Sequence, residues 1–388
     1  MPGRYVVFFL IMSLVMGSAH YYVWARLVRD TALPAPWGRL AAVLIALLFV
    51  SLMSSFIAFR HVSRSIATPI MWVVYTWLGV LFFLVLSLGM TDLVQVVTSR
   101  FGDRGSVDDD RRLFVSRVFG AVAAFVGIGA SAYGLASVLS PVAVRRVRVA
   151  IDKIAKGVSG YRIVQISDVH VGPTIGREFI EDIVKRINAL EPDMVAITGD
   201  LVDGSVDELR EHVAPLAKLR AKDGVFFVTG NHEYYSGADA WIAYLRTLGV
   251  RVLRNERVRV GGEQGFDVAG IDDASAHGFG GDHGSDLKKA LSERDSSRAV
   301  VLLAHQPKGI ELADDLGVDL QLSGHTHGGQ IFPWGFMVRL QQPFVVGLHK
   351  LARGAQIYVS RGTGYWGPPM RVGAPAEITE IELVSPAA

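Results

Sequence analysis

Five short polar segments in the second half of the chain combine carboxylate, amide and imidazole side chains. They read Asp168-Val169-His170, Gly199-Asp200, Gly230-Asn231-His232-Glu233, His305 and Gly324-His325-Thr326-His327. Oxygen and imidazole donors of this kind are ligands that divalent cations take from proteins, and two cations roughly 3.5 to 4 Å apart need one oxygen that bridges both. The segments therefore predict a two-metal site in which Asp200 is the candidate bridge.

Each polar segment follows a short apolar run that is typical of a buried strand. These runs cover residues 162–167, 194–198, 225–229, 299–304 and 320–323. Helical patterns lie among them, at residues 177–190, 206–220, 238–248 and 307–316. The alternation predicts a layered α/β fold, and in such folds the functional groups gather at the carboxyl ends of the strands.

A pair of divalent cations suits the hydrolysis of a phosphoester. The cations polarise a phosphoryl oxygen and lower the pKa of a bound water, which then attacks phosphorus in line with the leaving group. Taken singly, a buried His or Asp is more often a satisfied core group than a ligand. Five such segments, in order and each after a strand, are very unlikely to arise from core groups alone. They predict a metal-dependent phosphoric ester hydrolase.

The five segments also resemble, in order, the signature of the calcineurin-like metallophosphoesterase family over roughly residues 160 to 385. That signature is D-x-H, G-D, G-N-H-E, a lone H and G-H-x-H. The resemblance implies one metal held by Asp168, His170 and His327. It implies a second metal held by Asn231, His305 and His325, with Asp200 shared between the two. Mn, Fe and Zn all suit these donors, so the residues leave the metals unidentified.

The resemblance has further implications for catalysis and fold. His232 would lie near the leaving-group oxygen, where a general acid can protonate the departing alkoxide. The fold would be a four-layer α/β/β/α sandwich, with residues 251–255, 266–271, 357–360 and 377–383 forming much of the second sheet. Asp203, three residues after Asp200, could orient a ligand histidine or cap the helix that begins near Val206, and we predict the cap.

The first part of the chain has the composition of a membrane domain. The 388 residues exceed a typical single domain, and the mean hydropathy is +0.33. Four apolar runs, at residues 5–25, 40–59, 70–90 and 118–139, are long enough to span a bilayer, which excludes a signal peptide as the sole explanation. We predict an all-α transmembrane domain over 1–142, a basic linker over 143–159 and a catalytic domain over 160–388.

The arrangement of arginines predicts the orientation of the chain in a bacterial cytoplasmic membrane. Arg111 and Arg112 precede a glycine-diluted apolar run and resemble a twin-arginine export signal, although ordinary flanking charges would look the same. Arginines are more frequent in the first and third loops than on the opposite side, so the catalytic domain would lie outside the cytoplasm. The basic residues at 145–156 oppose this orientation, unless they contact anionic lipid headgroups.

Composition argues against cysteine-based sites and nucleic-acid binding. There is no cysteine, which removes thiolate ligands and disulfides. A net charge of +2, with no basic run interleaved with aromatic residues in the second half, predicts no nucleic-acid partner. Oligomeric state stays open.

Two regions of the second half are candidates for substrate contact. Residues 328–347 are rich in large apolar groups, Trp334 among them, and either contact the bilayer or a lipid acyl chain, or pack internally. Residues 272–286, rich in glycine, predict a mobile surface loop. Arg361 and Arg371 follow a strand, and either could bind a phosphate oxygen.

These features together predict a membrane-anchored dinuclear-metal phosphoesterase. Its substrate would be a phosphodiester or phosphomonoester of a lipid or envelope component. One alternative is a cytoplasmic-face pyrophosphohydrolase of a nucleotide-linked lipid precursor of the UDP-diacylglucosamine type. Another is a non-catalytic membrane scaffold, which the intact ligand set disfavours.

Overall fold

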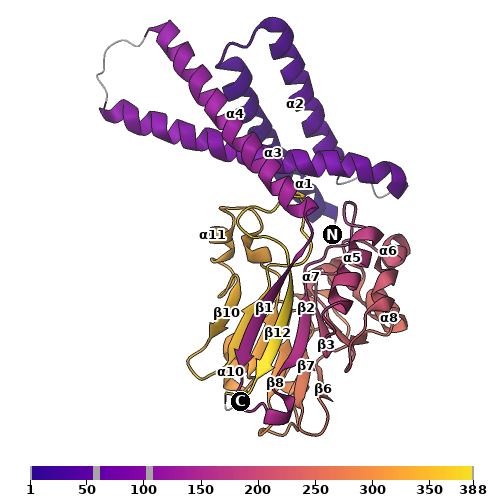
Figure 1. Ribbon diagram of the computed structural model, residues 1–388. Helices are drawn as coiled ribbons and strands as arrows, with labels where there is room; N and C mark the ends of the chain where they lie inside the picture. The colour runs from indigo at the N-terminus through magenta and orange to yellow at the C-terminus, as the bar shows by residue number, and fades with distance from the viewer. Residues whose placement is uncertain (1, 56–61, 102–107, 387–388) are drawn as a thin grey trace. The chain divides into compact units, whose positions relative to one another are not determined.

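The computed structural model describes residues 2–55, 62–101 and 108–386 (Figure 1). The chain forms two compact units. The helical unit contains Met1–Ala136 and Gly367–Met370, and the α/β unit contains Ser137–Trp366 and Arg371–Ala388.

Among the described residues, the helical unit has four helices that are long and apolar enough to cross a membrane. They are α1 (Pro2–Trp24), continued by the π-helix η1 (Ala25–Arg29), then α2 (Ala35–Ser55), α3 (Arg64–Phe101) and α4 (Asp109–Leu139). The last residues of the predicted run 40–59 lie outside the described residues. At 1.5 Å per residue the 38 residues of α3 extend roughly 57 Å, well beyond the apolar thickness of a bilayer.

Helix α4 packs through a stripe of small residues. The buried residues of α4 recur every three or four positions, at Gly120, Ala123, Gly127, Ser131 and Gly134. A Cβ on Gly127 would lie 3.0 Å from Leu84 of α3, so glycine permits a close approach of the two helices. Gly120, Gly127 and Gly134, three of the glycines that resembled the diluted core of an export signal, therefore have a packing role here.

The α/β unit is built on two six-stranded sheets. The first has the order β1 (Ala143–Ala150), β12 (Glu377–Val384), β2 (Tyr161–Ile166), β3 (Met194–Thr198), β4 (Val225–Val228) and β5 (Arg251–Val252). The second has the order β10 (Gly347–Lys350), β11 (Gln356–Val359), β9 (Leu320–Ser323), β8 (Val300–Leu303), β7 (Phe266–Gly270) and β6 (Glu256–Val260). Strands β2 to β5 are mutually parallel, as are β7, β8, β9 and β11.

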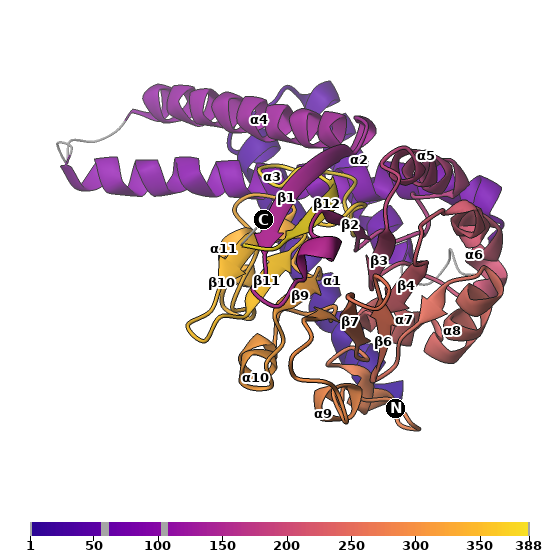
Figure 2. The ribbon, with the colours of Figure 1, turned by 60° about the horizontal axis from the view of Figure 1, so that its bottom comes forward.

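Three apolar cores separate four layers, which confirms the α/β/β/α sandwich. The first core joins the outer face of the first sheet to α5 (Arg177–Asn188), α6 (Val206–Val213) and α8 (Ala238–Thr247). The second lies between the sheets, and the third joins the second sheet to α9 (Leu287–Ala290) and α10 (Ile310–Asp315). Figure 2 shows α5, α6 and α8 beside the first sheet and α9 and α10 beside the second. Helix α5 contributes Ile180, Ile183, Val184 and Ile187, whose helical spacing places them on one buried face.

The membership of the second sheet differs from the prediction. Strands β7 and β11 lie in it, but β5 and β12 lie in the first sheet. Strand β12 pairs in parallel with β1 and antiparallel with β2, so it extends the first sheet beyond its parallel core. The helix predicted over 206–220 ends at Val213, because Pro215 interrupts the α-helical hydrogen bonds and a 3-10 helix, η4 (Ala214–Lys218), follows.

The basic stretch predicted as a linker also belongs to the fold. Residues 143–150 form β1, which pairs with β12 along its whole length. Arg146 lies 2.7 Å from Glu380, and Arg148 lies 3.1 Å from Glu382, so two of the basic side chains have acidic partners on the neighbouring strand. These exposed pairs add little stability, but they offset the positive charge that argued for a cytoplasmic position.

Candidate metal centre

The predicted ligands converge where strands of both sheets end. Asp168 and His170 follow β2, Asp200 follows β3, and Asn231 follows β4. From the second sheet, His305 follows β8, while His325 and His327 follow β9. Donor atoms lie within 4.8 Å of one another in three groups that can hold a metal ion. These groups are Asp168–His170–His327, His170–Asp200–His232 and Asp200–His305–His325.

Asp200 lies between the two predicted ligand sets. Its Oδ2 atom is 3.1 Å from Nε2 of His305 and 3.9 Å from Nε2 of His170. On one side, the Nε2 atoms of His170 and His327 are 3.1 Å apart, and on the other, Nδ1 of His325 is 3.2 Å from Nε2 of His305. One carboxylate oxygen of Asp200 therefore lies near histidines of both sets.

The residues present fit a pair of divalent cations. Oδ2 of Asp168 and Oδ1 of Asn231 are buried and have no hydrogen-bond partner among the described residues. Buried polar atoms are normally hydrogen-bonded, and a coordinated cation would satisfy both oxygens. Burial lowers the pKa of His325 to about 4 and moves that of His327 well below its usual value, so both are neutral, the form that binds metal. Burial lowers the pKa of His305 too, but the charge of Asp200 outweighs burial and raises it, so a cation would displace a proton there.

The backbone at the site adopts a conformation that side chains disfavour. The residues at positive φ include Asp168 (51°), His170 (53°), Asp200 (51°), His325 (71°) and His327 (51°). Left-handed backbone is uncommon for residues other than glycine and clusters at functional sites. The loops are held by their own ligands, since Asp168 accepts a 2.8 Å hydrogen bond from the His325 N–H and Asp200 accepts one from the His232 N–H.

Gly199 is required by space and by conformation. Its φ is 85°, and a Cβ there would lie 2.6 Å from the nitrogen of Gly230 and 2.7 Å from Nδ1 of His305. A side chain at this position would separate the loops that carry Asp200 and Asn231, so the glycine keeps the two strand ends in contact.

Asp203 binds two histidines and does not cap a helix, so the predicted cap is wrong. Its Oδ1 accepts from Nδ1 of His232 at 2.6 Å and lies 3.1 Å from Nδ1 of His170. The cap of α6 is Ser205, which forms a capping box with Glu208. Burial raises the pKa of Asp203, but the two histidines outweigh burial and lower it, so the carboxylate stays charged.

His232 lies beside Asp200 and is hydrogen-bonded to Asp203. Burial lowers the pKa of His232, but the hydrogen bond to Asp203 and the charge of Asp200 outweigh burial and raise the pKa to about 9. The imidazole is therefore protonated at neutral pH. Because Nδ1 is bound to Asp203, Nε2 is the nitrogen left to face a ligand, which suits a general acid.

Glu233 contributes to the site although sequence reasoning assigned it no role. This fully buried carboxylate accepts from the backbone N–H groups of Gly230 at 2.6 Å, Leu201 at 2.8 Å and Asp200 at 3.0 Å. It thereby ties the loop after β4 to the loop after β3. Burial and the charge of Asp200 raise its pKa to about 7. Its place at the third position of α7 (Asn231–Ser236) was the available signal.

Both arginines predicted to bind phosphate have partners inside the protein. Arg371 is only 1% exposed and donates to the carbonyl of Gly364 at 2.6 and 2.8 Å and to that of Ala374 at 2.8 Å. Arg361 forms a 2.7 Å ion pair with Glu377. Irregular loops leave carbonyls without strand partners, and a buried guanidinium satisfies them. Arg371 therefore supports the loop that contains Gly364 and Ala374 and does not reach a substrate. Trp334, the third residue predicted to contact the substrate, is exposed.

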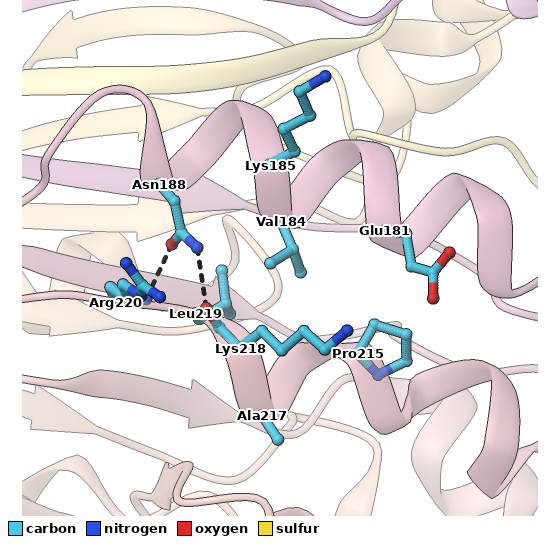
Figure 3. A pocket seen from close by; sticks show the side chains of 9 residues that line it. All are labelled: Glu181, Val184, Lys185, Asn188, Pro215, Ala217, Lys218, Leu219 and Arg220. Carbon is cyan, nitrogen blue, oxygen red and sulfur yellow. Dashed lines mark hydrogen bonds between the residues drawn. The ribbon is translucent and has the colours of Figure 1, made fainter.

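A surface pocket of about 610 Å³ between α5 and η4 includes none of the candidate ligands (Figure 3). Asn188 joins its two sides, because its side chain donates to the carbonyl of Lys218 and accepts from the N–H of Arg220, both at 2.8 Å. These bonds make the pocket a packing seam between two outer elements.

Comparison with known proteins shows the family to which this chain belongs. The calcineurin-like phosphoesterase family matches residues 161–329. Among solved structures, a dimetal phosphatase from Danio rerio aligns at 14% identity and a TM-score of 0.39, covering 57% of this chain and 91% of that one. The chain is 41% identical over 329 residues to a Bos taurus transmembrane protein with metallophosphoesterase domain, covering 80% of this chain and 73% of that protein. It is also 32% identical to an uncharacterized metallophosphoesterase of Campylobacter jejuni, covering 98% of each. The chain is thus a membrane protein of the calcineurin-like metallophosphoesterase family.

Proposed function

We propose that this protein is a membrane-anchored phosphoesterase that works with two divalent cations and hydrolyses a phosphodiester or phosphomonoester of a lipid or envelope component. The observation that carries the proposal is the position of Asp200 between two ligand groups, beside a histidine that can donate a proton. When bound, the cations supply polarisation of the phosphoryl group and a water of lowered pKa.

The residues of the chain have distinct roles in this proposal. One cation would be held by Asp168, His170 and His327, the other by Asn231, His305 and His325, and Asp200 would serve both. His232 donates its proton to the departing oxygen. Asp203 holds the rings of His170 and His232 in position through their Nδ1 atoms, as carboxylates do behind metal-binding histidines.

The direct test is hydrolysis of bis-p-nitrophenyl phosphate and p-nitrophenyl phosphate by the purified protein. We expect turnover with Mn²⁺ or Zn²⁺ and loss of turnover with a chelator, and the two rates rank diester against monoester. Folded protein that turns over neither compound with any of these ions would contradict the phosphoesterase proposal and favour the scaffold alternative.

The segment after the last candidate ligand favours a lipid substrate or a bilayer contact. Helix α11 (Gly335–Val338) contains no buried residue. Five large apolar side chains around it are more than half exposed, namely Phe332, Trp334, Phe336, Met337 and Leu340. Ordinary packing would bury such groups, and exposed apolar clusters commonly mark membrane or ligand contact.

Replacing Trp334 and Phe336 with serine tests this contact. We expect activity on a phospholipid in vesicles to fall about tenfold or more, because each buried aromatic ring contributes on the order of 1.5 to 3 kcal/mol. Activity on bis-p-nitrophenyl phosphate should fall much less. Leu312→Ser, on an exposed position of α10, is the matched control. Equal losses on both substrates would remove the lipid contact from the proposal.

We further propose that the transmembrane part covers residues 1–142, and that the catalytic part covers residues 143–388, includes β1 and lies outside the cytoplasm. The arginine bias of the loops supports this orientation, and the pairing of Arg146 and Arg148 with glutamates weakens the opposing argument. A C-terminal alkaline phosphatase fusion, active only outside the cytoplasm, should be active in a bacterial host. An inactive alkaline phosphatase fusion, together with a fluorescent fusion of green fluorescent protein to the same C-terminus, would favour the cytoplasmic-face pyrophosphohydrolase.

A further inference from the structure

Two exposed aromatic rings lie beside His232. The ring of Tyr235, on α7, is centred 5.4 Å from the His232 ring at an interplanar angle of 70°. The ring of Trp366 is centred 5.6 Å from it at 74°. Tyr235 is 65% exposed and Trp366 is 56% exposed, so apolar surface is open immediately next to the proton donor.

The position of Trp366 is fixed by a buried side chain. Gln330 donates from Nε2 to the Trp366 carbonyl at 2.9 Å, and its Oε1 accepts from the Trp366 N–H at 3.0 Å. One buried amide therefore holds both backbone groups of an exposed tryptophan. Gln330 itself has a positive φ of 47° and directly follows the 3-10 helix η6 (His327–Gly329). Trp366 is thus tied to the loop that carries His325 and His327.

Tyr235 is placed just as closely. It shares α7 with Asn231 and His232, so the ligand, the proton donor and the aromatic ring belong to one short helix. Phe279, on the 3-10 helix η5 (Ala276–Phe279), continues the aromatic surface, with its ring centred 5.8 Å from that of Tyr235. The apolar surface beside His232 therefore comes from three separate segments that the fold brings together.

We infer that Tyr235 and Trp366 form the leaving-group subsite and that it takes an apolar leaving group, a ring or a hydrocarbon. The inference rests on the proposed function, in which His232 protonates the leaving oxygen. Whatever is attached to that oxygen must lie against the surroundings of His232, which include the faces and edges of these two rings. An apolar group gains by covering them, whereas a polyol would lose water without gaining equivalent hydrogen bonds.

The subsite is tested by the ratio of kcat/KM between wild type and variant on esters with different leaving groups. The substrates are 1-naphthyl, n-hexyl and glyceryl phosphate, used as monoesters or methyl diesters according to which form the wild type hydrolyses with Mn²⁺. Comparing kcat/KM of wild type and variant on each substrate cancels the intrinsic reactivity of the leaving group. For Trp366→Ala and Tyr235→Ala we expect a loss of about ten- to hundredfold on an apolar ester and less than about threefold on the glyceryl ester.

Gln330→Ala should reproduce the selective loss of Trp366→Ala, because it releases the tryptophan backbone. Leu312→Ala, an exposed apolar position on α10, is the control and should leave all three ratios near one. Bound Mn²⁺ and circular dichroism of each variant distinguish a lost subsite from a lost metal centre. A loss confined to the naphthyl ester would assign a ring, and a loss on the hexyl ester would assign a hydrocarbon chain.

Equal losses on all three substrates, with metal retained, would overturn the subsite while leaving the phosphoesterase proposal intact. No turnover of any phosphoester by the metal-loaded wild type would instead contradict the proposed function, and the subsite with it. The two failures are therefore distinguishable within one set of assays.

Discussion

Replacing Asp200 with asparagine is expected to lower metal-dependent phosphoester hydrolysis on the order of 10³-fold or more. The Oδ2 atom of Asp200 lies between the two ligand groups, 3.1 Å from His305 and 3.9 Å from His170. Asparagine keeps the size of the side chain but removes its charge, and one of its two polar atoms becomes an N–H₂ donor that cannot bind a cation. The measurement is kcat/KM on bis-p-nitrophenyl phosphate, with the bound metal per chain determined in parallel.

The neighbouring interactions make this variant informative. Oδ1 of Asp200 accepts from the His232 N–H at 2.8 Å, and an amide oxygen can accept the same bond, so we expect the loop after β4 to keep its conformation. Asp182→Asn, on the exposed surface of α5, is the matched control and should retain full activity. An Asp200→Asn protein with wild-type turnover and metal content would exclude a bridging carboxylate.

The parts of the structure that follow from local sequence were predictable. Strands β3 and β9 begin and end at the predicted residues, because a short apolar run followed by glycine or a polar ligand specifies a buried strand and its end. The convergence of the ligands follows as well, since the carboxyl ends of parallel strands lie at one edge. Five spaced motifs therefore carry most of the candidate site.

The parts that depend on distant partners were not predictable in the same way. Asp203 precedes a helix, and its local position favoured a cap, but its partners His170 and His232 lie 33 and 29 residues away. Strand β12 was assigned to the wrong sheet because its apolar pattern is the same whichever neighbour it pairs with. For Arg371, residue type indicated a ligand for phosphate, and only the fold shows its burial against backbone carbonyls.

Replacing Asp203 with asparagine should lower kcat about 10- to 100-fold and move the alkaline limb of the pH profile to lower pH. His232 must be protonated to act as an acid, so activity should fall as pH rises through its pKa, which, despite burial, Asp203 and Asp200 raise to about 9. The hydrogen bond and charge of Asp203 contribute to that raised pKa. Their loss lowers the pKa, and the protonated fraction then declines at a lower pH.

A matched variant of the helix cap separates orientation of the histidines from support of α6. Ser205→Ala removes the cap of α6 and should cost about 1 kcal/mol of stability in thermal unfolding, with the pH profile unchanged. Asp203→Asn should instead shift the pH profile and leave thermal stability nearly unchanged, because Asp203 contacts His170 and His232 and takes no part in the capping box. If Asp203→Asn lowered stability but left kcat and the alkaline limb in place, His232 could not owe its raised pKa to Asp203, and the proposed role of Asp203 would be wrong.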